Sequence, residues 1–178
     1  MSLTGKTALI TGAGGGIGRA ISVALAKEKV NVILFGGNNV DKLKQTKQLV
    51  KEQGVNVWVY AGNLKDQDFL QSGLKKAIKE VGGFDILINT TGVGMHDTEG
   101  QSPVTMYAFK GAEVAIDLIY TPQESEFLRL AKLQGLRTLN GAAMLFYQAY
   151  YADCLYLDIL PSKTQAEELY QKFLLKKA

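Results

Sequence analysis

The stretch that decides the fold is Thr11-Gly12-Ala13-Gly14-Gly15-Gly16-Ile17-Gly18, which follows directly on the apolar segment 6–10. A strand that reverses into a helix within a few residues needs glycines, because they adopt positive φ angles and put no Cβ between backbone and a bound phosphate. A helix that begins near Gly16 points its free N–H groups at that phosphate. The stretch therefore predicts a dinucleotide-binding turn made of Gly12, Gly14, Gly15, Gly16, Ile17 and Gly18.

The residues after the turn favour a nucleotide site over a merely structural glycine-rich turn. Ile17, Ile21 and Leu25 recur at helical spacing. Ala20 and Ala24 are small enough for us to expect that the helix lies close on the strand through them.

Length and composition indicate a globular protein of one domain, with room for a small appendage. The chain has 47% hydrophobic and 21% charged residues, as soluble globular proteins do. No apolar run approaches the ~18 residues of a membrane span, so we expect no membrane contact. The first residues form no apolar signal segment, so we expect a cytoplasmic protein. A net charge of +3, spread along the chain, argues against a nucleic-acid partner. With one histidine, His96, and one cysteine, Cys154, we expect no metal site and a packed cysteine.

Apolar segments alternate along the chain between strand-like and helix-like patterns. We predict strands at residues 6–11, 30–35, 55–60, 84–89, 112–119 and 136–139. We predict helices at residues 16–28, 41–53, 66–81, 122–134, 141–157 and 163–176. This alternation is typical of an α/β fold with a doubly wound parallel sheet of the Rossmann type. We therefore expect a dinucleotide-binding domain at residues 1–140 and a C-terminal helical pair, residues 141–178, packed on it.

Two helix starts carry capping signals. Thr121 is the predicted N-cap of the fourth helix, with Pro122 at the first helical position and Glu124 reaching back. Ser162 and Gln165 form a second predicted capping box.

The longest stretch without a regular pattern, residues 90–103, follows the fourth predicted strand. An open α/β sheet has its ligand crevice at this edge, so we interpret the stretch as a functional loop. His96 lies in it and is a candidate general acid, although an exposed loop histidine is the plainer interpretation. Asp117, at the end of the fifth strand, is a candidate base or a residue that bonds the adjoining backbone.

Residues 1–89 carry the motifs of one family. The turn Thr11-Gly12-x-x-x-Gly16-x-Gly18 and the fourth strand, 84–89, resemble those of short-chain dehydrogenases/reductases. The resemblance implies that Asn63 and Leu64 pack on the adenine. The likeness then ends, because Tyr107 and Lys110 are one residue too close for that family's Tyr-x-x-x-Lys pair. We therefore assign no catalytic residue.

Three segments in the second half carry a further resemblance. Residues 88–95 read Ile-Asn-Thr-Thr-Gly-Val-Gly-Met, residues 117–122 read Asp-Leu-Ile-Tyr-Thr-Pro, and residues 140–149 read Asn-Gly-Ala-Ala-Met-Leu-Phe-Tyr-Gln-Ala. In this order they are similar to the cofactor-binding domain and closing helices of shikimate dehydrogenases, over about residues 85–178.

This second resemblance implies an NADP-binding part of an oxidoreductase that transfers a hydride between the nicotinamide and 3-dehydroshikimate or shikimate. The cofactor contacts that it implies are Thr90, Thr91, Gly92, Val93, Met95, Ile119, Gly141 and Met144. Tyr120 and Gln148 would contact the small-molecule substrate.

Shikimate dehydrogenases also carry an N-terminal catalytic domain that supplies a Lys/Asp acid–base pair. This chain starts at the cofactor domain, so we expect it to lack that pair and to be weak or inactive alone. Its partner would be a separate catalytic-domain chain or a second copy in a homo-oligomer. Two alternatives stay open: a divergent short-chain dehydrogenase/reductase, and a non-catalytic dinucleotide-binding module or fragment.

Cofactor choice is normally read at the end of the second strand, here residues 35–39, which contain neither an acid for NAD nor an arginine for NADP. Asn38 could bond either ribose form, and Lys42 or Lys44 could approach a phosphate. We favour NADP from the family resemblance, with NAD as the alternative, and expect less than about tenfold discrimination.

Overall fold

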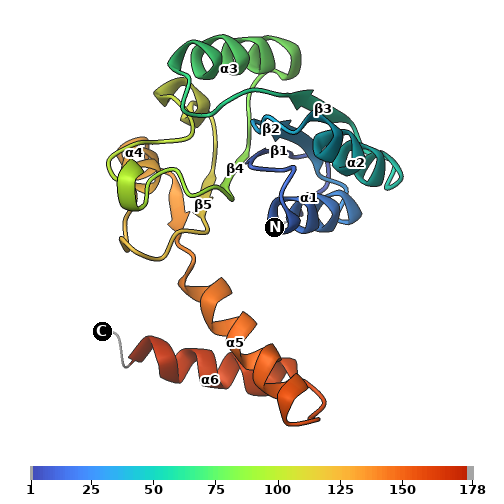
Figure 1. The fold of residues 1–178 in the computed structure, drawn as a ribbon, viewed down its shortest axis with the longest axis vertical. Helices are drawn as coiled ribbons and strands as arrows, with labels where there is room; N and C mark the ends of the chain where they lie inside the picture. Colours follow the sequence, from blue (N-terminus) through green and yellow to red (C-terminus); the bar gives the residue numbers. More distant parts are fainter. Residues whose placement is uncertain (1, 176–178) are drawn as a thin grey trace. The chain divides into compact units, whose positions relative to one another are not determined.

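The computed structural model describes residues 2–175, whose contacts divide the chain into two units, Met1–Asn140 and Gly141–Ala178. The first unit is a parallel sheet with helices on both faces, and the second is a pair of helices, α5 (Ala142–Tyr156) and α6 (Lys163–Leu175) (Figure 1). The expected packing of the pair on the first unit stays a prediction.

The sheet of the first unit is six-stranded and parallel throughout. Its strands are β1 (Thr7–Thr11), β2 (Asn31–Phe35), β3 (Val57–Tyr60), β4 (Ile86–Asn89), β5 (Val114–Asp117) and β6 (Arg137–Leu139). The strand order β3-β2-β1-β4-β5-β6 confirms the predicted doubly wound fold. The order reverses between β1 and β4, which is where such sheets open a ligand crevice.

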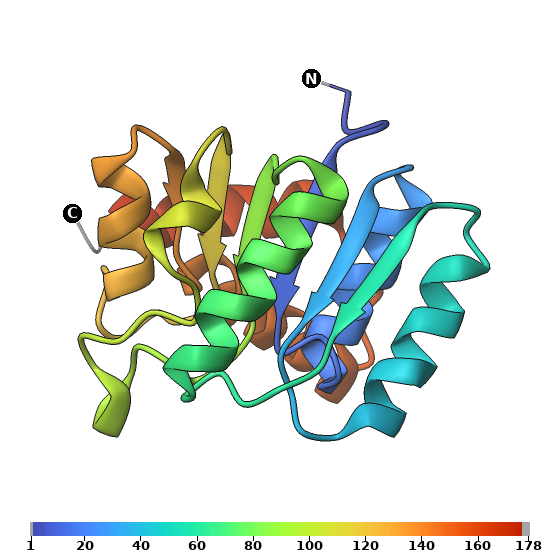
Figure 2. The same ribbon diagram turned by 90° about the horizontal axis from the view of Figure 1, so that it is seen from above.

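The strands are apolar on both faces because helices cover both (Figure 2). Ile10 and Leu34 pack with α1 (Gly16–Lys27) and α2 (Val40–Lys51). Leu9 and Leu87 pack on the other face with α3 (Gln67–Val81) and α4 (Glu126–Leu133). Two short 3-10 helices, η1 (His96–Thr98) and η2 (Met106–Phe109), lie in the connection between β4 and β5.

The face that α1 turns to the sheet matches our expectation in part, because Ile21 and Leu25 pack against the core. The expectation for the two alanines is wrong. Ala20 and Ala24 are exposed, and the buried residues of α1 are Gly18, Ser22 and Ala26. These three recur every four residues, so they form one row along the helix. The small side chains that let α1 approach the sheet are therefore those of this row.

The predicted start of the fourth helix is also wrong. α4 begins at Glu126, and its N-cap is Ser125, whose hydroxyl accepts a hydrogen bond from Leu128 N–H. The Thr121-Pro122 peptide is cis and lies in the turn before the helix. The Ser162 cap is confirmed, because its Oγ accepts from Gln165 N–H (3.3 Å).

Candidate functional site

The predicted turn lies between β1 and α1, and two of its glycines are required by close packing. Gly12 has φ +71°, and a Cβ there would lie 2.8 Å from Thr90 Oγ1. A Cβ on Gly18 would lie 2.6 Å from the Gly12 carbonyl oxygen. These contacts leave no room for a side chain, so both positions fix the path of the turn.

Packing against the protein does not explain Gly14 or Gly16. A Cβ on Gly16 would meet no atom within 4 Å, and on Gly14 the nearest atom would be an ordinary 3.5 Å away. A Cβ on Gly15 would meet only the Gly12 carbonyl oxygen, at 3.3 Å. Gly15, Gly16 and Ile17 are exposed. The turn thus presents bare backbone to an open space at the start of α1.

The start of α1 also lacks a side-chain cap among the described residues, because its N-cap is Gly15. The other helices on the sheet are capped by Asn39, Asp66 and Ser125. An uncapped first turn leaves N–H groups free to bind an anion, which the helix dipole also favours. The residues present therefore fit a dinucleotide pyrophosphate.

A buried threonine that the sequence analysis did not single out holds the turn from α2. The hydroxyl of Thr46 donates to the Ala13 carbonyl (3.0 Å) and accepts from Arg19 Nε (3.2 Å). The sequence signal that could have identified Thr46 is a polar residue at helical spacing from Leu43 and Val50, which are both buried in α2. The side chain ties the turn to a neighbouring helix.

A row of four buried polar side chains, Thr11, Asn89, Asp117 and Ser125, crosses the sheet at the crevice edge. Thr11 donates to Asn89 Oδ1 (2.8 Å), and Asn89 Nδ2 donates to Asp117 Oδ1 (2.9 Å). Ser125 then donates to Asp117 Oδ2. The row joins the ends of β1, β4 and β5 to the start of α4.

Asp117 is the anionic member of this row and is fully buried. Its Oδ1 also accepts from Ile119 N–H (3.0 Å), so the interpretation that it bonds the adjoining backbone is confirmed. Burial raises the pKa of the carboxyl, and the hydrogen bonds from Ser125, Ile119 and Asn89 oppose that rise. Through these bonds, Asp117 connects the end of β4 and the start of α4 to the end of β5.

The predicted functional loop begins at the same edge. Thr90 donates to the Thr11 carbonyl (2.7 Å), and Thr91 donates to Asn89 Oδ1 (2.7 Å). Further along, Thr98 Oγ1 accepts from Gly94 N–H (3.0 Å) and donates to the Gly92 carbonyl (2.9 Å). These bonds shape the loop beside the glycine turn. Within it, Val93 is buried, Met95 half-buried, and Gly92 and His96 exposed.

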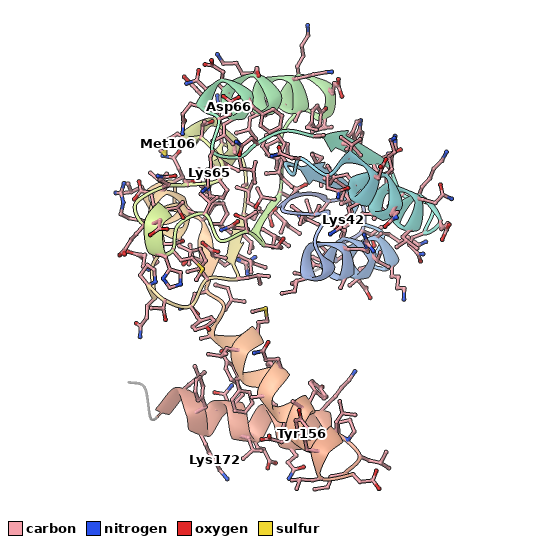
Figure 3. All side chains as sticks on the ribbon, in the orientation of Figure 1. Lys42, Lys65, Asp66, Met106, Tyr156 and Lys172 are labelled. Atoms are coloured by element: carbon pink, nitrogen blue, oxygen red, sulfur yellow. The ribbon has the colours of Figure 1, made fainter. Side chains whose placement is uncertain are left out.

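The end of β2, where cofactor choice is read, is built from Gly36 and Gly37, both with positive φ. Asn39 is used as the α2 N-cap, accepting from Lys42 N–H (3.0 Å), whereas Asn38 is exposed. Lys42 lies at the start of α2 (Figure 3).

Asn63 and Leu64 have local structural roles. Leu64 is buried against Gly36, where a Cβ would lie 2.5 Å from its side chain. The Asn63 side chain accepts from Lys65 N–H (3.0 Å). Their predicted contact with adenine stays a prediction.

The remaining predicted contacts fall in two places. Ile119 is buried after β5, and Tyr120 is 43% exposed. Gly141, Met144 and Gln148 belong to the second unit. The roles assigned to them toward cofactor and substrate stay predictions.

Tyr107 and Lys110 lie far from the turn. They line a hollow of about 440 Å³ with Gly83 and Phe84, which precede β4, whereas the glycine turn follows β1. Since β1 and β4 are parallel, the hollow and the glycine turn lie at opposite ends of the strands. The two residues therefore supply no acid–base pair at the turn.

None of the helices in residues 2–175 combines the length and hydrophobicity that crossing a bilayer would need. In the same residues, His, Cys, Asp and Glu side chains form no group of three or more that could hold a metal ion.

A parallel sheet with an uncapped glycine turn at its switch point is the arrangement of Rossmann-type dinucleotide-binding domains. The family model described as "short chain dehydrogenase" matches residues 6–117. The chain therefore belongs to the short-chain dehydrogenase family, and over most of its length it is a relative of the shikimate dehydrogenases.

The shikimate dehydrogenase (NADP(+)) of Caldanaerobacter subterraneus subsp. tengcongensis is 37% identical over 151 residues, which are 83% of this chain and 48% of that protein. General stress protein 39 of Bacillus subtilis is 39% identical over 103 residues, 58% of this chain and 36% of that protein. The chain spans about half the length of the curated relatives it matches.

Solved structures share the fold. A chorismate mutase/shikimate 5-dehydrogenase fusion protein from Clostridium acetobutylicum superposes with a TM-score of 0.70 at 24% identity, covering 99% of this chain and 57% of that one. A shikimate dehydrogenase in complex with NADP+ superposes with a TM-score of 0.62 at 26% identity, covering 95% of this chain and 55% of that one.

Proposed function

We propose that this chain binds NADP at the turn Gly12–Gly18 and forms the cofactor-binding part of an oxidoreductase that acts on 3-dehydroshikimate or shikimate. The observation that carries the proposal is the open, uncapped N-terminus of α1 beside Gly16, at the point where the strand order reverses. NADP in place of NAD is supported by the names of the relatives, shikimate dehydrogenase (NADP(+)).

In this proposal the pyrophosphate accepts hydrogen bonds from the free N–H groups of the first turn of α1. Thr46 holds the turn through the Ala13 carbonyl. Thr90 joins the crevice loop to β1. When bound, NADP supplies the hydride acceptor, and the protein supplies position. The chain's own residues therefore bind and orient the cofactor.

The substrate assignment rests on the same relatives and on the segments 88–95, 117–122 and 140–149. An acid–base group typically contributes about 10²–10⁴-fold to such a reaction. No such pair is assigned within the described residues of this chain. We therefore expect the rate of shikimate-dependent NADPH formation to lie well below ~1 per second, the low end of the usual range for enzymes.

Calorimetry with NADPH and NADH tests the cofactor site. Gly16→Asp should weaken NADPH binding by at least about tenfold, because it sets a carboxylate and a side chain where the pyrophosphate would lie. Ala24→Asp is the matched control, since it adds the same charge to an exposed position two turns along α1. Equal affinity of Gly16→Asp and wild type, or no binding by wild type, would refute the site. A preference above about tenfold between the cofactors would contradict the expected weak discrimination.

A further inference from the structure

Helix α5 is apolar around its whole circumference. Its sequence is AAMLFYQAYYADCLY, and Asp153 is its one charged residue. Helices of this kind are usually covered on most sides. Here Cys154 is the residue of α5 that is buried. The helix therefore carries more apolar surface than one neighbouring helix can cover.

Helix α6 covers one side of α5. The Phe146 ring lies 5.3 Å from that of Tyr170, and the Tyr147 hydroxyl donates to Glu167 (2.6 Å). Tyr150 closes the end of the pair, because its hydroxyl accepts from Ser162 N–H (3.1 Å). These contacts define the pair as a small helical unit.

A groove of about 610 Å³ remains between the two helices, lined mainly by apolar side chains such as Phe146, Tyr150 and Leu169. Beside it, the end of α5 and the connection to α6 expose further large apolar residues. Leu155 is 84% exposed, and Tyr156 is 88% exposed. Tyr156 lies at the end of α5, next to the connection (Figure 3). Continuous apolar surface of this kind marks an interaction site.

Two opposite charges line the same groove, Asp153 from α5 and Lys172 from α6. Within the described residues neither takes part in an ion pair. The short connection makes the helices antiparallel neighbours. Asp153 lies close to the connection, whereas Lys172 lies towards the C-terminal end of α6.

We propose that the groove is the interface with a second copy of this chain, related by a two-fold axis across it. In a two-fold interface, a contact between two residues occurs twice. Asp153 would then meet the partner's Lys172, and Lys172 would meet the partner's Asp153. The groove is thus complementary in charge to itself, and its aromatic side chains are of the kind that anchor interfaces.

Sedimentation equilibrium of the full chain tests this interface. Wild type should have twice the mass of the 19.4 kDa chain. Asp153→Lys and Lys172→Asp should each weaken association by about tenfold or more, because each places like charges in contact twice. An equimolar mixture of the two variants should recover the dimer, since every contact in the mixed dimer again pairs opposite charges.

Lys163→Asp is the matched control, because it reverses a charge on the opposite side of α6 and should leave association unchanged. Far-UV circular dichroism of every variant verifies that the helices persist. A monomeric wild type at 100 μM, on the order of the weakest useful self-association, would overturn the proposal. So would single variants that associate like wild type, or a mixture that stays monomeric.

Discussion

Replacement of Asp117 by alanine tests the polar row most directly. The carboxylate accepts hydrogen bonds from Asn89, Ile119 and Ser125 at a fully buried position. A hydrogen bond to a charged group contributes about 1.5–3 kcal/mol, so three of them contribute about 4–9 kcal/mol. Relief of the buried charge offsets several kcal/mol of this loss. We expect Asp117→Ala to lower the free energy of unfolding by about 3–5 kcal/mol, because it leaves three buried donors without their acceptor.

Asp117→Asn should cost less, about 1–2 kcal/mol. The amide oxygen can still accept from Asn89 and Ile119, and the Ser125 hydroxyl can turn to accept from the new NH₂ group. The substitution also removes a titration. Since burial raises the folded pKa of Asp117 above the ordinary 3.8, its contribution to stability is largest below that value and is lost as the pH rises through the folded pKa. Wild type should therefore lose stability relative to Asp117→Asn over that rise.

Urea unfolding followed by tryptophan fluorescence measures these differences. Trp58 is the one tryptophan of the chain and lies in β3, so its signal reports on the first unit. Asp97→Ala removes an exposed acid and should stay within about 0.5 kcal/mol of wild type. If Asp117→Ala cost less than about 1 kcal/mol, comparable with an ordinary substitution, the row would not hold the crevice edge together.

Two further substitutions give clear outcomes. Gly18→Ala should lower the free energy of unfolding by about 1–3 kcal/mol, because its Cβ would meet backbone atoms of Gly12 and Ala13. Gly16→Ala should change the free energy of unfolding by no more than about 0.5 kcal/mol. Equal losses for the two variants in urea unfolding would contradict the geometry of the turn. The hydrogen bond to Glu167 raises the pKa of Tyr147 to about 12. Burial and the hydrogen bond to Glu80 also raise the pKa of Tyr60, so ultraviolet titration of Tyr147→Phe should show one late-ionising tyrosine fewer than wild type. The stability from this bond is present below the ordinary pKa of 10 and is lost as the pH passes through about 12. The same number of late-ionising tyrosines in Tyr147→Phe and wild type would rule the bond out.

The fold was predictable because its signals are local. The glycine turn, the apolar strands and their alternation with helices lie within short windows of sequence, and the predicted strands all occur with shortened ends. The start of α4 was not predictable in the same way. Ser125 is the cap, and its hydroxyl is held by Asp117 on a different element. The residues from Thr121 match the sequence pattern of a capping box, but the helix begins after Ser125, whose hydroxyl is held by a tertiary contact with Asp117.

In the candidate site too, features set by local sequence were predictable, and features set by contacts with distant elements were not. The close packing of Gly12 and Gly18 follows from what a strand-to-helix turn requires, so spacing alone could indicate it. The supports of the turn depend on partners from distant elements, as Thr46 of α2 does for Ala13. The apolar periodicity of α1 identified Ile21 and Leu25, which pack against the core, but it also included Ile17, which is 52% exposed. Closeness to the sheet instead depends on the row of small residues.

The polar row also has a consequence for how the sheet is assembled. Thr11 pairs in register with Asn89, and Asn89 with Asp117, in strands that are otherwise almost entirely apolar. A slip of two residues would keep every side chain on its own face, so apolar contacts alone would discriminate weakly against it. The slip would separate these three side chains and leave buried polar groups unpaired, at about 1–3 kcal/mol each. The row thus fixes which residues of β1, β4 and β5 lie side by side, and it holds the three strand ends level where the crevice opens.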